Sequence, residues 1–371
     1  MPFVDDRQTW NSLATACRYF WKSDGDKDVC APWPKCIPPP EKKKNSLSIG
    51  PIAISNRYLA SGSLSGQIDI WDNSKGHIRT VKRMKGMIQS MAFDDTGTIL
   101  AACSTESKNP ILYDIAKDND KNHNDENGDG AFLELPLSDH NPLDGKSRYA
   151  NQMAFWDGCW HCTTVNGFLW KFIVVDSPKT ETKGRQRRRE VQCIQVYSLG
   201  ISRWFSELLS LHHKWVATSA VNSGVVRVKN TQRKGENDIV LTHNARCITA
   251  MSISDTHIVT AGDHGIVQLW QLPSKDEDVG VGYDHPAPIQ LDGLEAIVTS
   301  IDISPCGTIV AASDCDGHVL TWNAQSGRQL AKVGDPCQSI HTILFTSNGS
   351  MLVASGTDGT IRCWSRSELT A

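Results

Sequence analysis

The chain has 371 residues, of which 39% are hydrophobic, and its formal net charge is −3. This length exceeds that of one ordinary domain unless the fold is a repeat or a closed all-β architecture. No run of about eighteen apolar residues could form a transmembrane helix, and the first residues lack the basic start and apolar core of a secretory signal. The twelve cysteines are scattered singly, so we expect reduced thiols in the cytoplasm or the nucleus.

Residues 1–44 differ in composition from the rest of the chain and are expected to form an extension. Between Asp6 and Trp21 the apolar residues recur with helical spacing, which predicts a helix with one apolar face. Prolines on both sides of Trp33 and after Ile37 then break regular structure, and residues 41–45 are typical of a solvated linker. The predicted second domain covers residues 45–371.

One pattern recurs from residue 47 onward: a strand, a tight turn, and a strand that ends in an aromatic residue. In the last copy, Asp358-Gly359 separates two alternating apolar runs and suits the positive φ angles of a hairpin turn. A further strand precedes each pair and carries apolar residues in a fixed rhythm, as at Ile340, Ile343 and Phe345. The closing strands lie at residues 67–72, 111–114, 167–170, 225–230, 266–270, 319–322 and 361–364. Units of roughly forty residues indicate a repeat architecture.

Over residues 47–371 the chain resembles WD-repeat proteins. The resemblance implies an all-β fold, a single closed seven-bladed β-propeller of four-stranded blades. Trp71-Asp72 is the one literal Trp-Asp pair, and Tyr113 and Lys229 replace the closing Trp in the second and fourth units. The Gly-His pair usual before the first strand is missing, with His243 as the nearest substitute, which weakens the buried Asp-His-Ser-Trp network that some members use. The closing tryptophans are expected to be largely buried: Trp71, Trp170, Trp270, Trp322 and Trp364.

Ring closure is left open by the sequence. In the family an N-terminal strand usually completes the last blade, but the candidate Pro38 to Ser46 is rich in proline and lysine; the alternative is a short edge formed by Ser365 to Ala371. Three long inserts follow the closing strands, and the family architecture places such loops on the bottom face. They are Lys117 to Gly130 (acidic), Ser177 to Glu190 (basic) and Pro273 to Pro286.

Few residues suggest catalysis or metal binding. Cys159 and Cys162 have the spacing of half a metal or redox site, but alternate residues of a strand point to opposite faces, so we interpret them as packing thiols. There is no Gly-rich phosphate loop and no nucleophile elbow. We therefore expect no enzyme, no metal and no cofactor. The basic run at residues 183–189 is either a nuclear address or nucleic-acid patch, or a solvated insert; the net charge argues against nucleic acid as the main partner.

The N-terminal stretch Trp10 to Trp21 resembles the second half of an F-box, where a helix with Cys-Arg, an aromatic residue and Trp ends the motif. Here Cys17-Arg18 is followed by Tyr19, Phe20 and Trp21, whereas the opening Leu-Pro helix of an F-box is not recognisable in residues 1–9. The resemblance implies docking on a Skp-type adaptor, with the protein acting as substrate receptor of a Skp–cullin–F-box ubiquitin ligase. The other hypothesis is a non-catalytic scaffold for protein–protein interaction, with no membrane partner.

A partner site is predicted at the top rim of the propeller channel. The resembled architecture places there the residues one or two before the first apolar position of each inner strand: Ser48, Met87, Arg148 and Tyr149, Arg203 to Phe205, Arg246, Ala296 and Gln338. Arg, Tyr and Trp often dominate binding energy, and arginines bind carboxylates or phosphate through paired hydrogen bonds. We therefore predict that Arg148, Tyr149, Arg203, Trp204 and Arg246 bind an acidic or phosphorylated peptide. The alternative is that Trp204 caps the channel and the arginines pair with nearby acids.

Overall fold

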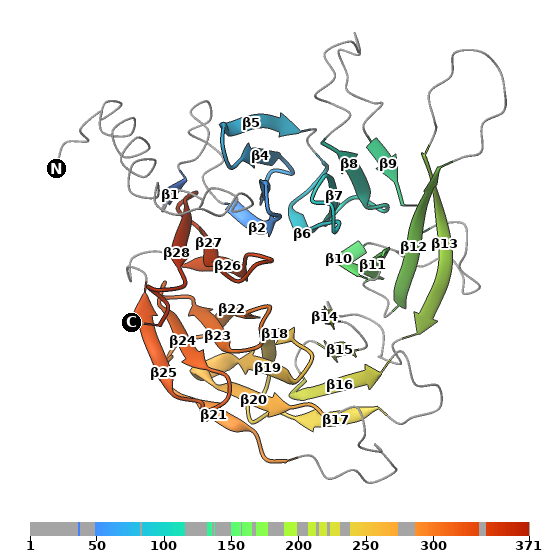
Figure 1. Cartoon of the computed structure of the whole chain (residues 1–371). Helices are drawn as coiled ribbons and strands as arrows, with labels where there is room; N and C mark the ends of the chain where they lie inside the picture. The colour runs from blue at the N-terminus through green and yellow to red at the C-terminus, as the bar shows by residue number, and fades with distance from the viewer. Residues whose placement is uncertain are drawn as a thin grey trace, which may run out of the picture.

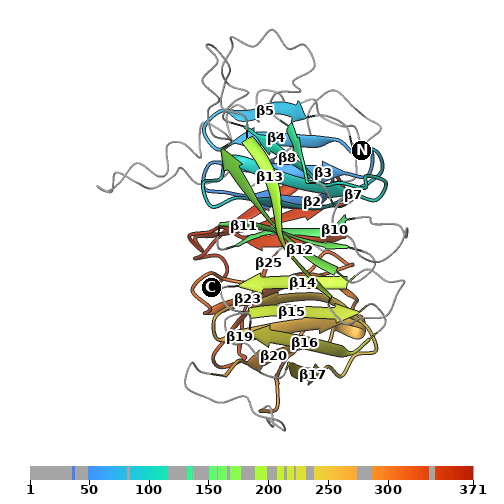
Figure 2. The same cartoon turned by 90° about the vertical axis from the view of Figure 1, so that its right-hand side faces the viewer.

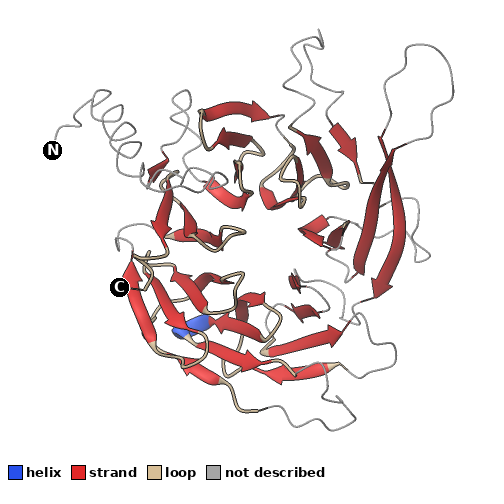
Figure 3. Cartoon of the chain, viewed as in Figure 1, coloured by secondary structure: helices blue, strands red, loops and turns tan. Residues whose placement is uncertain are grey.

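Seven four-stranded antiparallel sheets stand in a ring and form the seven-bladed β-propeller that the sequence predicts (Figure 1). The structure, a computed structural model, describes residues 36–37, 49–81, 84–115, 132–135, 137, 150–156, 158–164, 168–176, 189–198, 207–212, 215–220, 223–230, 238–273, 286–333 and 339–370. These residues are strands and their connections, with a single 3-10 turn at Asp263–Gly265 (Figure 3). Within these ranges no helix has the length and hydropathy needed to cross a membrane.

The first three blades follow one another along the chain. Blade I comprises β2 (Ile49–Ile54), β3 (Tyr58–Ser63), β4 (Ile68–Asp72) and β5 (Gly76–Val81). Blade II comprises β6 (Ile88–Phe93), β7 (Ile99–Ser104), β8 (Ile111–Asp114) and β9 (Phe132–Glu134). Blade III comprises β10 (Ala150–Trp156), β11 (Cys159–Thr164), β12 (Phe168–Asp176) and β13 (Arg189–Ser198).

The other four blades continue around the ring, and the last takes one strand from the N-terminal side. Blade IV comprises β14 (Glu207–His212), β15 (Trp215–Ala220), β16 (Val225–Asn230) and β17 (Ile239–Thr242). Blade V comprises β18 (Ile248–Ile253), β19 (His257–Gly262), β20 (Val267–Gln271) and β21 (Ile289–Leu291). Blade VI comprises β22 (Val298–Ile303), β23 (Ile309–Asp314), β24 (Val319–Asn323) and β25 (Gln329–Val333). Blade VII comprises β26 (Ile340–Phe345), β27 (Met351–Gly356), β28 (Ile361–Ser365) and β1 (Cys36–Ile37).

The first strand of every blade lies next to the central axis, and the strands of a blade run between the two end faces of the ring (Figures 1 and 2). The second strand is enclosed by neighbouring blades, so both of its faces need apolar or small residues. Accordingly β3, β23 and β27 are buried at every position, and Ala60 and Ala311 are completely covered.

Apolar clusters between blades form the core. Each of the clusters found among the described residues joins two neighbouring blades, as where Trp322 of blade VI packs with Leu269 of blade V. Polar side chains on the first strands add hydrogen bonds across the same boundaries. The Asp302 carboxylate on β22 accepts the N–H of Phe345 on β26 at 2.8 Å and the hydroxyl of Ser252 on β18 at 2.9 Å. This one carboxylate therefore links blades V, VI and VII.

The closing tryptophans are buried in four of the five blades where burial is predicted. Trp71, Trp170, Trp270 and Trp322 are at most 6% exposed. Trp364 packs against the cluster between blades VI and VII but is less completely buried than these four. Trp364 pairs with Leu352 of β27 on the inner side, but the short outer strand β1 pairs only with Arg362 and Ile361, so no described strand covers the outer side of Trp364.

Ring closure is settled by β1. Cys36 and Ile37 pair with β28, so the closing strand precedes both the segment Pro38 to Ser46 and the expected boundary at residue 45. The expected alternative, an edge strand at the C-terminus, is wrong. After β28 the chain turns, and Leu369 is completely buried between blades VI and VII, where its carbonyl accepts the Thr321 hydroxyl at 2.7 Å.

The three inserts connect the third and fourth strands of blades II, III and V. Apart from a few residues at their ends, they lie outside the described residues. The boundary of the second insert is different from the expectation. Arg189 and Glu190 belong to β13 and pair with Asp176 and Val175 of β12. The strands of this hairpin therefore continue further than the sequence indicates.

Candidate functional site

The top face is formed by the loops that enter each first strand and by the turns between second and third strands. The same hydrogen bond joins these two segments in four blades. The carbonyl of the residue just before the first strand accepts the N–H of the first turn residue: Met87 with Thr105, Cys247 with Asp263, Ile297 with Cys315, and Ser339 with Thr357, at 2.9–3.3 Å. The residues preceding the first strands therefore lie on the top face, as the predicted rim requires.

The turns between second and third strands depend on a repeated glycine. Gly66, Gly265, Gly317 and Gly359 occupy equivalent positions and all have positive φ. A side chain at Gly66 or Gly265 would also collide with the backbone carbonyl of the next loop, from Met84 or Leu294 respectively. Glycine therefore lets each turn lie against its neighbouring loop on the top face.

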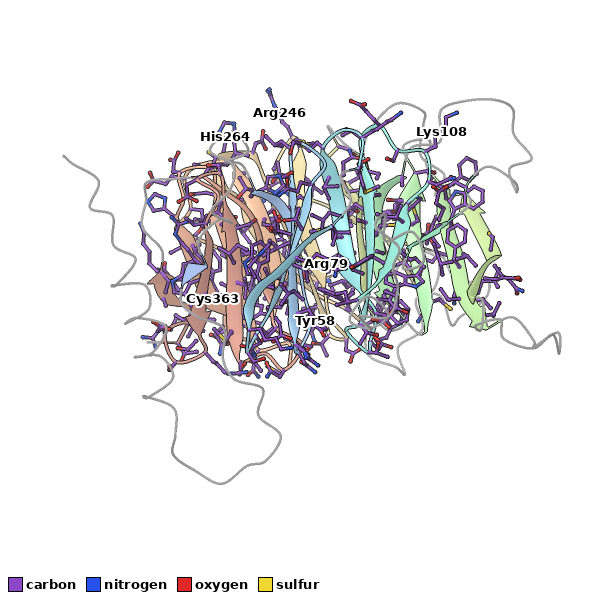
Figure 4. The ribbon with its side chains drawn as sticks, turned by 90° about the horizontal axis from the view of Figure 1, so that it is seen from above. Tyr58, Arg79, Lys108, Arg246, His264 and Cys363 are labelled. Carbon is purple, nitrogen blue, oxygen red and sulfur yellow. The ribbon has the colours of Figure 1, made fainter. Side chains whose placement is uncertain are left out.

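Arg246 is the one member of the predicted site within the described residues. Its side chain is exposed on the top face, together with His264 and Lys108, whereas Tyr58 lies toward the opposite face (Figure 4). The guanidinium makes no hydrogen bond or ion pair with another described residue. Arg148, Tyr149, Arg203 and Trp204 lie outside the described residues, as do Ser48, Phe205 and Gln338; Met87 and Ala296 are half-buried on the rim.

The loop that carries Arg246 is fixed by the buried His243. The Nδ1 atom of His243 accepts the Ala245 N–H at 2.8 Å, and its Nε2 lies 3.3 Å from the Thr260 carbonyl. Because Nδ1 is an acceptor, the proton of the neutral ring is on Nε2, which donates to Thr260. Burial lowers the pKa of His243, which favours this neutral form.

The rest of blade V completes this support. Trp270 donates its indole N–H to the Thr260 hydroxyl at 2.9 Å, and the Asn244 N–H donates to the Gln268 side chain at 3.0 Å. A His–Thr–Trp chain of contacts is thus present in blade V, although the sequence lacks the usual Gly-His pair. The backbone at Arg246 is therefore held in place before any partner binds, which lowers the entropic cost of binding.

The cysteine pair in blade III belongs to the core. Cys159 and Cys162 are buried free thiols on β11, and burial raises the pKa of Cys162 well above its usual value. Within the described ranges no three His, Cys, Asp or Glu side chains are grouped so that they could hold a metal ion. Residues 6–21, where a helix and the F-box-like motif are predicted, and the basic run up to residue 188 lie outside the described residues.

Sequence reasoning missed the turn residues of the top face. His264, Asp316 and Asp358 are at the tips of the turns in blades V, VI and VII, each just before the glycine with positive φ. The signal was available, because each of these turns precedes a predicted closing strand. Ile297, which is 51% exposed beside the turn of blade VI, was missed because it directly precedes an apolar strand and looks like part of it.

Comparison with known proteins identifies the repeats. The sequence pattern of the family "WD domain, G-beta repeat" matches residues 290–323 and 327–365. The first match spans the outer strand of blade V and three strands of blade VI, and the second spans the outer strand of blade VI and three strands of blade VII. Because the sequence repeat is offset by one strand from the structural blade, the last blade needs an outer strand from elsewhere, which β1 supplies.

Several curated proteins are similar over part of the chain. The mitotic checkpoint protein BUB3.3 of Arabidopsis thaliana is 29% identical over 111 residues, which is 29% of this chain and 35% of that protein. Autophagy-related protein 16 of Arabidopsis thaliana is 27% identical over 111 residues, 30% of this chain and 20% of that protein. The small ribosomal subunit protein RACK1y of Oryza sativa subsp. japonica is 31% identical over 75 residues, 20% of this chain and 22% of that protein.

The matched segments thus span about a third or less of these relatives. Three observations indicate the same repeat architecture. They are the two matched repeats, the seven four-stranded blades and the hydrogen bond that recurs on the top face. The chain is therefore a seven-bladed β-propeller whose residues 290–323 and 327–365 are WD repeats, and WD-repeat propellers generally act as non-catalytic interaction scaffolds.

Proposed function

We propose that this protein is a non-catalytic scaffold that binds an acidic or phosphorylated segment of a partner protein on the top rim. The observation that carries the proposal is Arg246: an exposed arginine without an ion-pair partner among the described residues, on a loop fixed by His243. An exposed guanidinium of this kind can form paired hydrogen bonds with a carboxylate or a phosphate. The alternative was that the rim arginines pair with nearby acids. For Arg246, no contact among the described residues supports it.

The other members of the proposed site are Arg148, Tyr149, Arg203 and Trp204. The support for them is positional. Tyr149 directly precedes β10 as Met87, Cys247 and Ile297 precede their first strands, and Arg148 stands one residue further back, as Arg246 does. Arg203 and Trp204 lie four and three residues before β14. Aromatic and arginine side chains on adjoining blades would supply both contact area and charge. The free thiols of the described cysteines favour a place in the cytoplasm or the nucleus.

Single alanine substitutions test the site. Arg148→Ala, Arg203→Ala and Arg246→Ala should each weaken the capture of peptides from an array of phosphoserine and Glu-rich sequences, with phosphate-free, uncharged versions as blanks. Arg328→Ala is the matched control, because Arg328 is exposed on the turn between β24 and β25, at the opposite face. If all three variants bind like the wild type while the fold is intact, the site is elsewhere.

The alternative function, substrate receptor of a Skp–cullin–F-box ligase, is supported by the sequence Cys17 to Trp21 alone. This alternative is tested by a different interaction. A Skp-type adaptor should co-purify with the full chain and be lost on deletion of residues 1–30. Absence of the adaptor from the purified full chain would remove this alternative and leave the rim proposal untouched.

A further inference from the structure

Five exposed residues form a continuous strip across the top of blades V and VI: Arg246, His264, Glu295, Ile297 and Asp316. Backbone contacts establish that they are neighbours. The Asp263 N–H donates to the Cys247 carbonyl, Gly265 lies against the Leu294 carbonyl, and the Cys315 N–H donates to the Ile297 carbonyl. The chain segments that carry the five residues thus touch one after another. We call this surface the V–VI strip.

Charge is separated along the V–VI strip. At the blade V end are the guanidinium of Arg246 and the imidazole of His264, which is 85% exposed and has its Nε2 atom 3.8 Å from the Asp263 carboxylate. Toward blade VI, Glu295 and Asp316 are exposed carboxylates, and neither forms an ion pair with a described cation. Ile297, which is 51% exposed, follows Glu295 by two residues, and its carbonyl accepts the N–H of Cys315, the residue before Asp316.

The unpaired state of Asp316 is specific to blade VI. The equivalent turn residue of blade VII, Asp358, forms an ion pair with Arg362 at 2.6 Å, four residues further on. In blade VI the residue four positions after Asp316 is the buried Leu320. The other acid of this turn, Asp314, is buried and bonded to His318 at 3.0 Å. The blade VI turn therefore presents a carboxylate that its own blade does not neutralise.

His264 adds a conformational feature at the middle of the strip. Its backbone is left-handed, with φ 60° and ψ 29°, a region that few residues other than glycine adopt. The turn nevertheless keeps a large imidazole at the tip, where the equivalent residue of blade I is Ser65. Strained residues of this kind persist where the surrounding structure enforces them and often lie at binding sites.

We propose that the V–VI strip binds one extended partner segment of mixed charge. An acidic or phosphorylated residue of the segment binds Arg246, an apolar residue packs on Ile297, and a Lys or Arg next to it pairs with Glu295 and Asp316. This inference rests on the proposed function at Arg246 and adds the chemistry of the rest of the segment. An apolar contact flanked by complementary charges is a favourable arrangement, because the charges fix register while the apolar contact supplies buried area.

The test uses synthetic peptides in which a phosphoserine and a Leu-Lys pair are separated by one to six Gly-Ser residues. Fluorescence polarisation measures their affinity for the wild type, for Arg246→Ala and for the double variant Glu295→Lys/Asp316→Lys. Asp95→Lys is the control, because Asp95 is an exposed acid in the turn between β6 and β7, at the opposite face. Circular dichroism establishes that each variant is folded.

The double charge reversal should weaken binding of the best peptide by about tenfold or more, the effect of losing one good ion pair. The same variant should regain affinity for a peptide in which Lys is replaced by Glu, and Asp95→Lys should change neither value. Ile297→Ser should weaken binding of the Leu peptide but not of a peptide with Ser at that place.

The failures of the two proposals are distinguishable. Suppose that the double variant binds the Lys and Glu peptides as the wild type does, whereas Arg246→Ala binds neither. The proposal for the V–VI strip is then wrong and the rim proposal stands. If Arg246→Ala binds normally while the charge reversal acts as described, the proposed function is wrong at Arg246. If no peptide of the series binds the wild type, the inference is overturned.

Discussion

At the scale of single residues, several polar side chains stabilise the turns at the face opposite the rim. Ser55, Ser254 and Ser304 each bond to the backbone in the turn that follows a first strand. Asp72 of the literal Trp-Asp pair accepts the Ser74 N–H and binds Arg57 at 2.8 Å. Arg246 differs because its charge has no such use within the described structure.

Cys306 is the residue whose reactivity the structure predicts most sharply. It is exposed in the turn between β22 and β23, where Thr308 is 2.9 Å and the Arg366 guanidinium 3.5 Å from its sulfur. Partial burial opposes ionisation of the thiol, but hydrogen bonds from Ser304, Thr308 and Arg366 outweigh it and lower the pKa to about 6. The group is therefore largely thiolate at pH 7 and becomes protonated as the pH falls through 6.

Alkylation by iodoacetamide, followed by mass spectrometry, should give a rate for Cys306 that reaches half its maximum near pH 6. Arg366→Ala should move this midpoint to higher pH, because one donor to the thiolate is lost. Cys315 is the internal comparison, because it is exposed in a turn of the same blade and receives no hydrogen bond from an arginine among the described residues. Equal midpoints for Cys306 and Cys315 would show that the cluster does not stabilise the thiolate.

At the scale of strands and blades, the sequence predicts the features that recur in each blade. The hairpins between second and third strands, the apolar rhythm of the first strands and the closing aromatics recur, so weak signals reinforce one another. What occurs once is harder to predict. The closing strand β1 has two residues, too few for any periodicity, and Trp364 looks like the other closing tryptophans although its blade lacks a full outer strand.

The two tryptophans Trp322 and Trp364 give a matched comparison of burial. Trp322 is completely buried and donates its indole N–H to the Asp292 carbonyl at 3.0 Å, so Trp322→Ala should cost about 3–5 kcal/mol in the free energy of unfolding. Trp364→Ala should cost clearly less, because the side chain is partly exposed. Urea unfolding measures both. Equal losses would contradict the environment described for Trp364.

At the scale of the whole molecule, the ring is stable only if it is closed, since each blade buries its faces against its neighbours. The closure has two described components: β1 on the outer edge of blade VII, and Leu369 between blades VI and VII. The sequence indicated neither, because each depends on contacts between residues far apart in the chain. The position of the rim residues could be predicted because it follows from the repeat. The charge pattern of the rim could not, because it depends on the residues of the turns between second and third strands.

Two N-terminal deletions separate closure from partner binding. Removal of residues 1–30 keeps β1 and should leave the melting temperature nearly unchanged, whereas removal of residues 1–40 should lower it by several degrees. The physical reason is the loss of the strand paired with Arg362 and Ile361, which exposes the edge of β28. Thermal unfolding followed by circular dichroism measures both. A large loss with the shorter deletion would show that residues before β1 brace the ring.

The most direct test of the central claim is to locate bound peptide on the molecule. A photo-reactive side chain is placed either at Asn244, exposed on the loop that carries Arg246, or at Gln325, exposed on the turn between β24 and β25 at the other face. Illumination with the best-binding phosphoserine peptide should attach the peptide to the protein modified at position 244 and leave position 325 unlabelled. Labelling at position 325, or equal labelling at both, would contradict a binding site on the top rim.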